Sequence, residues 1–268
     1  FNDLRFGTLS IKPNAENFVF KYKIEIDSKG IPHFFEEPKD KQDAKKLLSD
    51  LLKRMKVKNS ELIDELYKKG KSVLMVSGHY NNWELMITAQ QMLLPHQAIG
   101  IGKPLTNKFW DKILNKRRAR FGMRIINANN VKEKMEEWKD EPTASLVLSD
   151  QSPGDSHKSY WTKFLNQDTA VLFGAELMAN MYDFAVVYFQ IDKVKRGHYE
   201  ISFQPITEIP REEAYGYITD KHCEYLEQAI KTNPEFWVWT HKRWKRELPE
   251  DLPALKIKQK ESFEKKFR

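Results

Sequence analysis

His79 and Glu84 are the two side chains in this sequence whose types and spacing best suit proton transfer. They lie in the stretch VSGHYNNWE, where a histidine follows an apolar run inside a short polar turn. In a continuous helix, residues five positions apart would point about 140° away from each other. A turn from a strand into a helix can fold them together, so that Glu84 accepts a hydrogen bond from one ring nitrogen. The other ring nitrogen would then be free to act as a general base towards a substrate hydroxyl.

Other interpretations of the same residues remain open at this point. A glutamate five residues after a histidine is common by chance, and the helix dipole favours an acid in a first turn. A metal site is a weaker interpretation, because no third ligand follows at a recognisable spacing. The chain has no Gly-x-Ser-x-Gly sequence for a nucleophilic serine, and Ser77 lacks that context. Cys223, the single cysteine, lies in an amphipathic stretch that is more typical of packing.

The elements that must position His79 alternate between strands and helices. SVLMVSG predicts a buried strand before the histidine, Gly78 permits a sharp turn, and NNWELMITAQQMLL predicts a helix capped by its asparagines. Later stretches repeat this alternation, which indicates an α/β fold with a mainly parallel sheet flanked by helices. In such folds the chemistry lies at the carboxyl ends of the strands. We also expect a loop over 151–161 and helices over 169–182 and 234–245.

Three regions of the chain differ in their pattern of apolar, polar and charged residues. Residues 1–38 are atypical: they alternate apolar and polar side chains around a Ser-Lys-Gly turn, which predicts a hairpin. Residues 39–250 hold the alternating strands and helices and form the expected catalytic domain. Residues 251–268 are a charged tail that we expect to be frayed.

The composition limits the class of partner. The chain has 268 residues, 40% of them hydrophobic, and a net charge of +7, which favours anionic partners such as a phosphorylated lipid, an anionic membrane or an acidic carrier protein. No nucleic-acid-binding motif occurs, and acidic residues are mixed throughout, so nucleic acid is disfavoured. The single cysteine excludes an internal disulfide and fits a reducing compartment. No apolar run approaches the length of a membrane span.

Two basic stretches could bind an anion. KRRAR (116–120) places four cations in five positions at the end of an expected helix, with Lys103 and Lys108 just upstream. Arginine suits bidentate phosphate recognition, but a cationic last turn is also favoured simply by the helix dipole. His241, Lys242 and Arg243 form a second basic stretch with the same two interpretations. The nearby Trp237, Trp239 and Trp244 are more typical of core or membrane-interface aromatic residues than of ligand stackers.

Four stretches in order resemble the bacterial lipid A late acyltransferases, within the lysophospholipid acyltransferase superfamily. SGHYNNWE resembles the family's His-x4-Glu/Asp block, and DKILNKRRARFG its arginine-rich block. LVLSDQSPG is similar to the Asp-Gln/His-x-x-Gly block, and NPEFWVWTHKRWKRE to the C-terminal signature. The resemblance implies that His79 is the general base and that Glu84 orients and polarises it. It also places Arg118 and Asp150 at the family's other functional positions, and Arg117 and Arg120 are neighbours that could take the place of Arg118 in this match. The residues that we expect to bind the substrate are Arg118, Asp150, Arg120, Lys103 and Gln151.

The activity implied by the resemblance is transfer of a fatty acyl chain from acyl carrier protein to a hydroxyl of a lipid A precursor. The thioester is a substrate, so no cofactor or metal is expected. The expected partners are the carrier protein, a phosphorylated glycolipid acceptor and an anionic membrane surface. Family members begin with an apolar anchoring helix, whereas residues 1–38 here are polar, so we expect peripheral association with the cytoplasmic face of the bacterial inner membrane. A lysophospholipid, an aminolipid or another lipid remains an alternative acceptor, and a homologue that only binds lipid is disfavoured by the presence of both His79 and Glu84.

Overall fold

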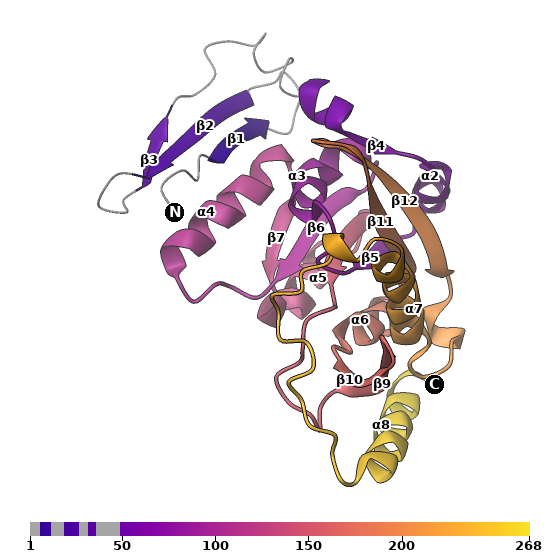
Figure 1. Cartoon of the computed structure of the whole chain (residues 1–268). Coiled ribbons are helices and arrows are strands. Elements are labelled where there is room, and N and C mark those ends of the chain that lie inside the picture. Colours follow the sequence, from indigo (N-terminus) through magenta and orange to yellow (C-terminus); the bar gives the residue numbers. More distant parts are fainter. Residues whose placement is uncertain (1–5, 12–18, 27–31, 36–48) are drawn as a thin grey trace.

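A seven-stranded sheet forms the centre of the molecule. The computed structural model describes residues 6–11, 19–26, 32–35 and 49–268, and Figure 1 shows the sheet with helices around it. Five of its six neighbouring strand pairs are parallel, and only the pair of β11 with β12 is antiparallel. The mainly parallel α/β fold expected from the sequence is therefore confirmed. In spatial order the strands are β4 (Met55–Val57), β12 (His198–Thr207), β11 (Ala185–Lys195), β5 (Val73–Ser77), β8 (Thr143–Leu148), β6 (Gln97–Gly102) and β7 (Arg124–Asn127).

Helices bury both faces of this sheet. The central strand β5 is buried along its whole length, and its side chains alternate between two apolar cores. Val73 and Met75 face a core shared with α2 and α3, whereas Leu74 and Val76 face a core shared with α5, α6 and α7. A continuous apolar strand is what a sheet covered on both faces requires. The helices are α2 (Glu61–Lys68), α3 (Trp83–Leu93), α4 (Lys108–Arg118), α5 (Val131–Glu137), α6 (Gly174–Tyr182), α7 (Tyr217–Thr232) and α8 (Leu252–Phe267).

A β-hairpin joins the predicted loop over 151–161 to the predicted helix over 169–182 and overlaps the edges of both. β9 (Tyr160–Phe164) and β10 (Gln167–Val171) pair antiparallel, and helix α6 begins only at Gly174. Leu165 and Asn166 both have positive φ angles, of 50° and 63°, as the two-residue turn of a hairpin requires. The helix predicted from 169 therefore starts five residues too early. A short apolar run does not by itself distinguish a strand from a buried helix, and here its first residues are a strand.

The helix predicted over 234–245 does not form. A short 3-10 helix, η4 (Pro234–Phe236), is followed by extended chain that pairs with the residues after β5. The N–H of Asn81 donates to the carbonyl of Phe236 at 2.8 Å, and the N–H of Val238 donates to the carbonyl of His79 at 3.1 Å. These backbone groups bond across to a distant segment, so they are not available for helical hydrogen bonds.

The C-terminal residues form helix α8, whereas the sequence suggested a frayed tail. Phe263 anchors this helix, because its ring is 4% exposed and packs against the rings of Phe173 and Tyr215 at 5.9 and 5.2 Å between centroids. One buried aromatic residue among many charged ones gives only a weak periodic pattern. The sequence therefore carried little sign of this helix.

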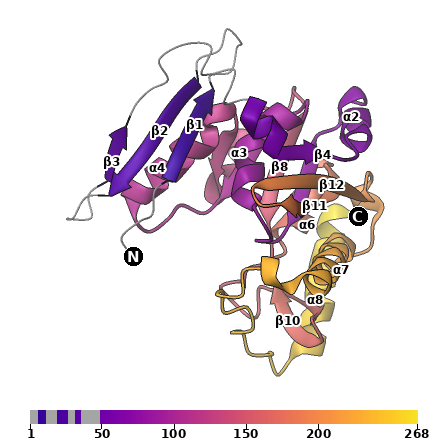
Figure 2. The same cartoon turned by 45° about the horizontal axis from the view of Figure 1, so that its top comes forward.

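A second, smaller sheet lies beside α4, as Figure 2 shows. It consists of β1 (Phe6–Ile11), β2 (Val19–Ile26) and β3 (Pro32–Phe35), all antiparallel. β2 and β3 pair as the predicted hairpin would, although the expected turn falls within 27–31, outside the described residues. The domain boundaries at 38 and 250 stay a prediction.

Candidate active site

The sheet brings His79 and Asp150 to the same edge. Strands β5 and β8 are parallel neighbours, and their last paired residues are Ser77 and Leu148. The N–H of Ser149 donates to the carbonyl of Ser77 at 3.0 Å and extends the pairing by one residue. His79 and Asp150 each lie two residues beyond the paired ends of their strands. Because the strands run in the same direction, the two side chains emerge side by side.

Asp150 holds the imidazole ring of His79. The ring Nδ1 lies 2.6 Å from Asp150 Oδ1, and the backbone N–H of His79 donates to Oδ2 at 2.9 Å. The indole N–H of Trp237 donates to the same Oδ2 at 2.9 Å. Burial would raise the pKa of this 4% exposed carboxyl, but the hydrogen bonds from His79 and Trp237 outweigh burial and lower the pKa. An ionised carboxylate only accepts hydrogen bonds, so Nδ1 carries the proton and Nε2 is the basic nitrogen.

Glu84 is bonded to Arg118, which corrects the expected hydrogen bond between Glu84 and His79. Arg118 Nε donates to Glu84 Oε2 at 3.3 Å, and its Nη2 pairs with Oε1. Helix α3 begins at Trp83, because Asn82 caps it by accepting from the N–H of Leu85. Glu84 therefore projects from the first turn of α3 towards the last turn of α4. The carboxylate on the histidine comes instead from the neighbouring strand, β8.

The four sequence blocks described in the sequence analysis agree with one family. The model of the bacterial lipid A biosynthesis acyltransferase family matches residues 46–246, three quarters of the chain. This chain belongs to that family. Acyl transfer is accordingly its general activity. No curated protein matched the chain.

Gly78 lets α7 of this acyltransferase closely approach the pair of His79 and Asp150, which we call the dyad. A Cβ atom at this position would lie 2.8 Å from both terminal methyl groups of Leu226 and 3.1 Å from Asp150 Oδ2. Its φ is not in the left-handed region, whereas Asn81, two residues after His79, has a φ of 54°. The glycine is therefore needed for space, and the sharp turn expected at Gly78 falls at Asn81.

The other predicted binding residues lie in different surroundings. Lys103 is exposed in the segment between β6 and α4, and Gln151 is exposed directly after Asp150. Arg120 falls in the short 3-10 helix η1 (Ala119–Phe121), but its side chain lies outside the described part of the structure. The structure thus brings His79 to Asp150 and Glu84 to Arg118, and it does not place Lys103 or Gln151 in contact with either pair.

The second basic stretch supports the loop after Asp150. Arg243 is 4% exposed and donates to the carbonyl of Ala170 at 2.7 Å, so it holds the hairpin β9–β10 and is not an open anion contact. His241 Nε2 accepts from the N–H of Ser152 at 2.9 Å. The indole of Trp244 donates to Thr169 Oγ1 at 2.9 Å. An anion contact was one of the two open interpretations of this stretch, and for Arg243 the structure favours a supporting role instead.

Trp237 is the site residue that the sequence analysis missed. Its ring is 5% exposed, which fits the expected core role, but its indole N–H also reaches Asp150. The only signal in the sequence was its place in the C-terminal signature, and pairing of that segment with the residues after β5 depends on tertiary structure.

Cys223 and metal chemistry receive no structural support. Burial raises the pKa of the Cys223 thiol to about 12, which makes it a poor nucleophile. Within the described ranges, no three His, Cys, Asp or Glu side chains gather as metal ligands would.

No helix in the same ranges is long and apolar enough to cross a membrane.

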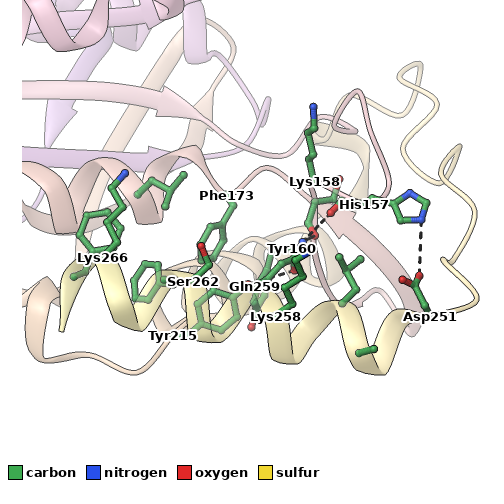
Figure 3. A pocket seen from close by; sticks show the side chains of 16 residues that line it. His157, Lys158, Tyr160, Phe173, Tyr215, Asp251, Lys258, Gln259, Ser262 and Lys266 are labelled. Carbon is green, nitrogen blue, oxygen red and sulfur yellow. Dashed lines mark hydrogen bonds and ion pairs between the residues drawn. The ribbon is translucent and has the colours of Figure 1, made fainter.

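A groove of about 660 Å³ lies along α8, away from this dyad. Figure 3 shows it between α8 and the residues at the start of β9. Its floor is aromatic, formed by Tyr160, Phe173, Tyr215 and Phe263. His79 and Asp150 are not among the described residues that line it, so this groove is separate from the candidate active site.

Proposed function

We propose that this acyltransferase moves a fatty acyl chain from a thioester on acyl carrier protein to a hydroxyl of a lipid A precursor. The observation that carries the proposal is the contact of 2.6 Å between His79 Nδ1 and Asp150 Oδ1 in a member of this family. The reaction would take place at the cytoplasmic face of the bacterial inner membrane.

His79 would act as the general base. Its Nε2 takes the proton from the acceptor hydroxyl while the hydroxyl oxygen attacks the thioester carbonyl. The tetrahedral intermediate then collapses, the new ester forms, and the bond from carbon to sulfur breaks. The imidazolium returns its proton to the departing thiolate, so that the base is regenerated. The side chain of His79 is 23% exposed, which leaves the ring accessible to a substrate.

Asp150 would orient His79, in the role that the sequence analysis gave to Glu84. Its ionised carboxylate fixes the tautomer and stabilises the imidazolium that forms during transfer. The edge of the His79 ring also packs against Trp83, with 5.3 Å between ring centroids. The ring is therefore held in position from two sides.

Arg118 would bind a phosphate of the acceptor, with Glu84 fixing its guanidinium group. The two side chains are 27% and 28% exposed, so the pair is partly open to solvent. A guanidinium has five N–H donors, and the ion pair with Glu84 leaves some of them for a second anion. This division of labour keeps Arg118 in the substrate-binding role that the resemblance implied.

The decisive experiment measures transfer from a labelled acyl carrier protein to a purified lipid A precursor. We expect product from the wild type, and a loss of at least about 100-fold in rate for His79→Ala, since general base catalysis contributes about 10² to 10⁴-fold. His198→Ala is the matched control, because His198 lies at the start of β12, where its ring Nδ1 contacts the carbonyl of Arg196 and no other described residue forms a hydrogen bond with the ring.

Two outcomes would reject parts of the proposal. Near-full activity of a folded His79→Ala protein would reject the base. Failure of the folded wild type to acylate the lipid A precursor would reject that acceptor, and lysophospholipid and aminolipid acceptors would then be tested in the same assay. Replacing the carrier protein with acyl-coenzyme A in a parallel reaction tests the donor.

A further inference from the structure

Helix α4 and the loop before it carry a local excess of positive charge. From Lys103 to Arg118 the chain has six Lys or Arg residues and one carboxylate, Asp111. Over the whole chain the two charges are much closer in number, with 45 basic and 38 acidic residues. A surface of this kind attracts anions over a distance of about 10 Å at moderate ionic strength.

Among the described residues, three lysines of this segment have no neighbouring acid as a partner, whereas Arg118 is paired with Glu84. In the described part of the chain, Lys103, Lys108 and Lys112 are exposed and make no ion pair. The carboxylate of Asp111 is used within the segment, where it accepts from the N–H of Leu105 at 2.8 Å and from the side chain of Asn115 at 3.2 Å. The positive charge is therefore available to an external partner.

Large apolar side chains are exposed among these lysines. Leu105, Phe109 and Trp110 are 43%, 47% and 37% exposed, and no residue of α4 is fully buried. The rings of Phe109 and Trp110 contact each other, with 5.6 Å between their centroids. An adjacent Phe and Trp beside unpaired lysines is the composition of a helix that lies in a membrane interface. Trp in particular favours the level of the lipid headgroups.

We infer that this surface docks on an anionic lipid bilayer, with the aromatic rings entering the interface and the lysines contacting the headgroups. We call it the α4 docking face; its residues are Lys103, Leu105, Lys108, Phe109, Trp110 and Lys112. Figure 1 shows α4 at the outside of the molecule, next to β1–β3. The inference rests on the proposed function for its biological meaning, because a lipid acceptor resides in such a bilayer.

Helix α4 links the docking face to the candidate active site. Its last turn carries Arg118, whose guanidinium group is paired with Glu84 in the first turn of α3. His79 lies five residues before Glu84 in the strand-to-helix turn. A bilayer on the α4 docking face would therefore lie at the other end of the helix that carries Arg118. An acidic protein could pair with the lysines, but three exposed apolar side chains gain most from an acyl layer.

The test is sedimentation of the 268-residue chain with vesicles, without any acyl donor. Vesicles of phosphatidylglycerol and phosphatidylcholine are compared with vesicles of phosphatidylcholine alone. We expect binding only to the anionic vesicles, weakened on the order of 100-fold when Lys103, Lys108 and Lys112 are all changed to Gln. Phe109→Ser combined with Trp110→Ser should also lower the partition by at least about tenfold, through lost apolar burial.

Matched controls change the same properties elsewhere. Lys256, Lys258 and Lys265 of α8, changed together to Gln, remove the same charge from another exposed helix. Ile257→Ser combined with Val194→Ser removes two other exposed apolar side chains, which are 61% and 58% exposed. The inference is overturned if the α4 variants bind the anionic vesicles as the wild type does, or if the control variants lose as much binding. It is also overturned if the α4 variants keep vesicle binding but lose binding to acyl carrier protein. Because no reaction takes place, failure of the proposed function leaves this readout unaffected.

Discussion

At the scale of single residues, the site depends on one carboxylate that accepts several hydrogen bonds. Asp150 receives the ring and backbone N–H groups of His79 and the indole N–H of Trp237. A carboxylate with this many donors stays ionised, and it keeps the proton of His79 on Nδ1. Glu84 has its own partner in Arg118. The two acids therefore have different partners: Asp150 contacts His79, and Glu84 contacts Arg118.

Asp150→Asn should inactivate the enzyme while keeping its shape. The amide cannot hold the Nδ1–H tautomer, and it cannot stabilise the imidazolium, so kcat should fall on the order of 10³-fold. Acyl transfer is measured together with thermal unfolding. Asp168→Asn is the control, because Asp168 is an exposed hairpin residue with only a long contact of 3.6 Å to Lys163. A kcat for Asp150→Asn within a few-fold of the control would show that Asp150 does not orient His79.

At the scale of elements, a segment near the C-terminus completes the site. Residues 236–238 pair with the backbone of the turn after β5, and this pairing places Trp237 against Asp150. Downstream, His241 and Arg243 hold the loop after Asp150 and the hairpin β9–β10. The helix predicted over 234–245 would have removed these contacts. An extended segment can bridge the carboxyl ends of two strands, whereas a helix would have used its backbone groups internally.

Trp237→Phe should separate the hydrogen bond from the packing of the ring. A hydrogen bond to a charged acceptor is worth about 1.5–3 kcal/mol, so kcat should fall about tenfold. Without this donor the carboxylate of Asp150 is held less firmly against the His79 ring. Trp244→Phe is the matched control, because its indole donates to Thr169 and not to Asp150. Equal kcat values for the two variants would leave Trp237 with a packing role only.

At the scale of the whole molecule, a buried acid links two helices that cover the sheet. Glu176 of α6 is completely buried, and its Oε2 accepts from the N–H and the hydroxyl of Thr219 in the first turn of α7. Its Oε1 has no partner among the described residues. Burial raises the pKa of Glu176 to about 7, in spite of the hydrogen bonds from Thr219, which lower it. Helix α7 in turn carries Leu226, which packs against Gly78.

The contribution of Glu176 to the stability of the fold should therefore fall as pH rises from about 4.5 to about 7. In this range the folded protein keeps a proton on Glu176 that the unfolded chain has lost, so raising the pH favours unfolding. Glu176→Gln cannot ionise, and it should be more stable than the wild type above pH 7 by on the order of 3 kcal/mol. Urea unfolding at pH 5 and pH 8 measures the difference, with Glu250→Gln as an exposed control. Equal pH dependence of Glu176→Gln and the wild type would show that Glu176 is not the group responsible.

The sequence predicted those features that depend on local patterns. The buried apolar run before His79 and the Asn82 cap are local, and they led to the correct alternation of strands and helices. It failed where an apolar run was ambiguous, as in β10, or where one buried side chain held an element, as Phe263 does for α8. The family was also recognisable, because its four blocks occur in order along the chain.

By itself, therefore, the sequence identified His79 as the candidate base and indicated the fold class and the family. Only the tertiary structure decided which carboxylate contacts the ring of His79. Glu84 is near it in sequence, but the helix that starts at Trp83 turns Glu84 towards Arg118. Asp150 is 71 residues away along the chain, yet the parallel register of β5 and β8 places it at 2.6 Å. The physical reason is that strand pairing sets distances between residues far apart in sequence, and spacing along the chain carries no record of that pairing.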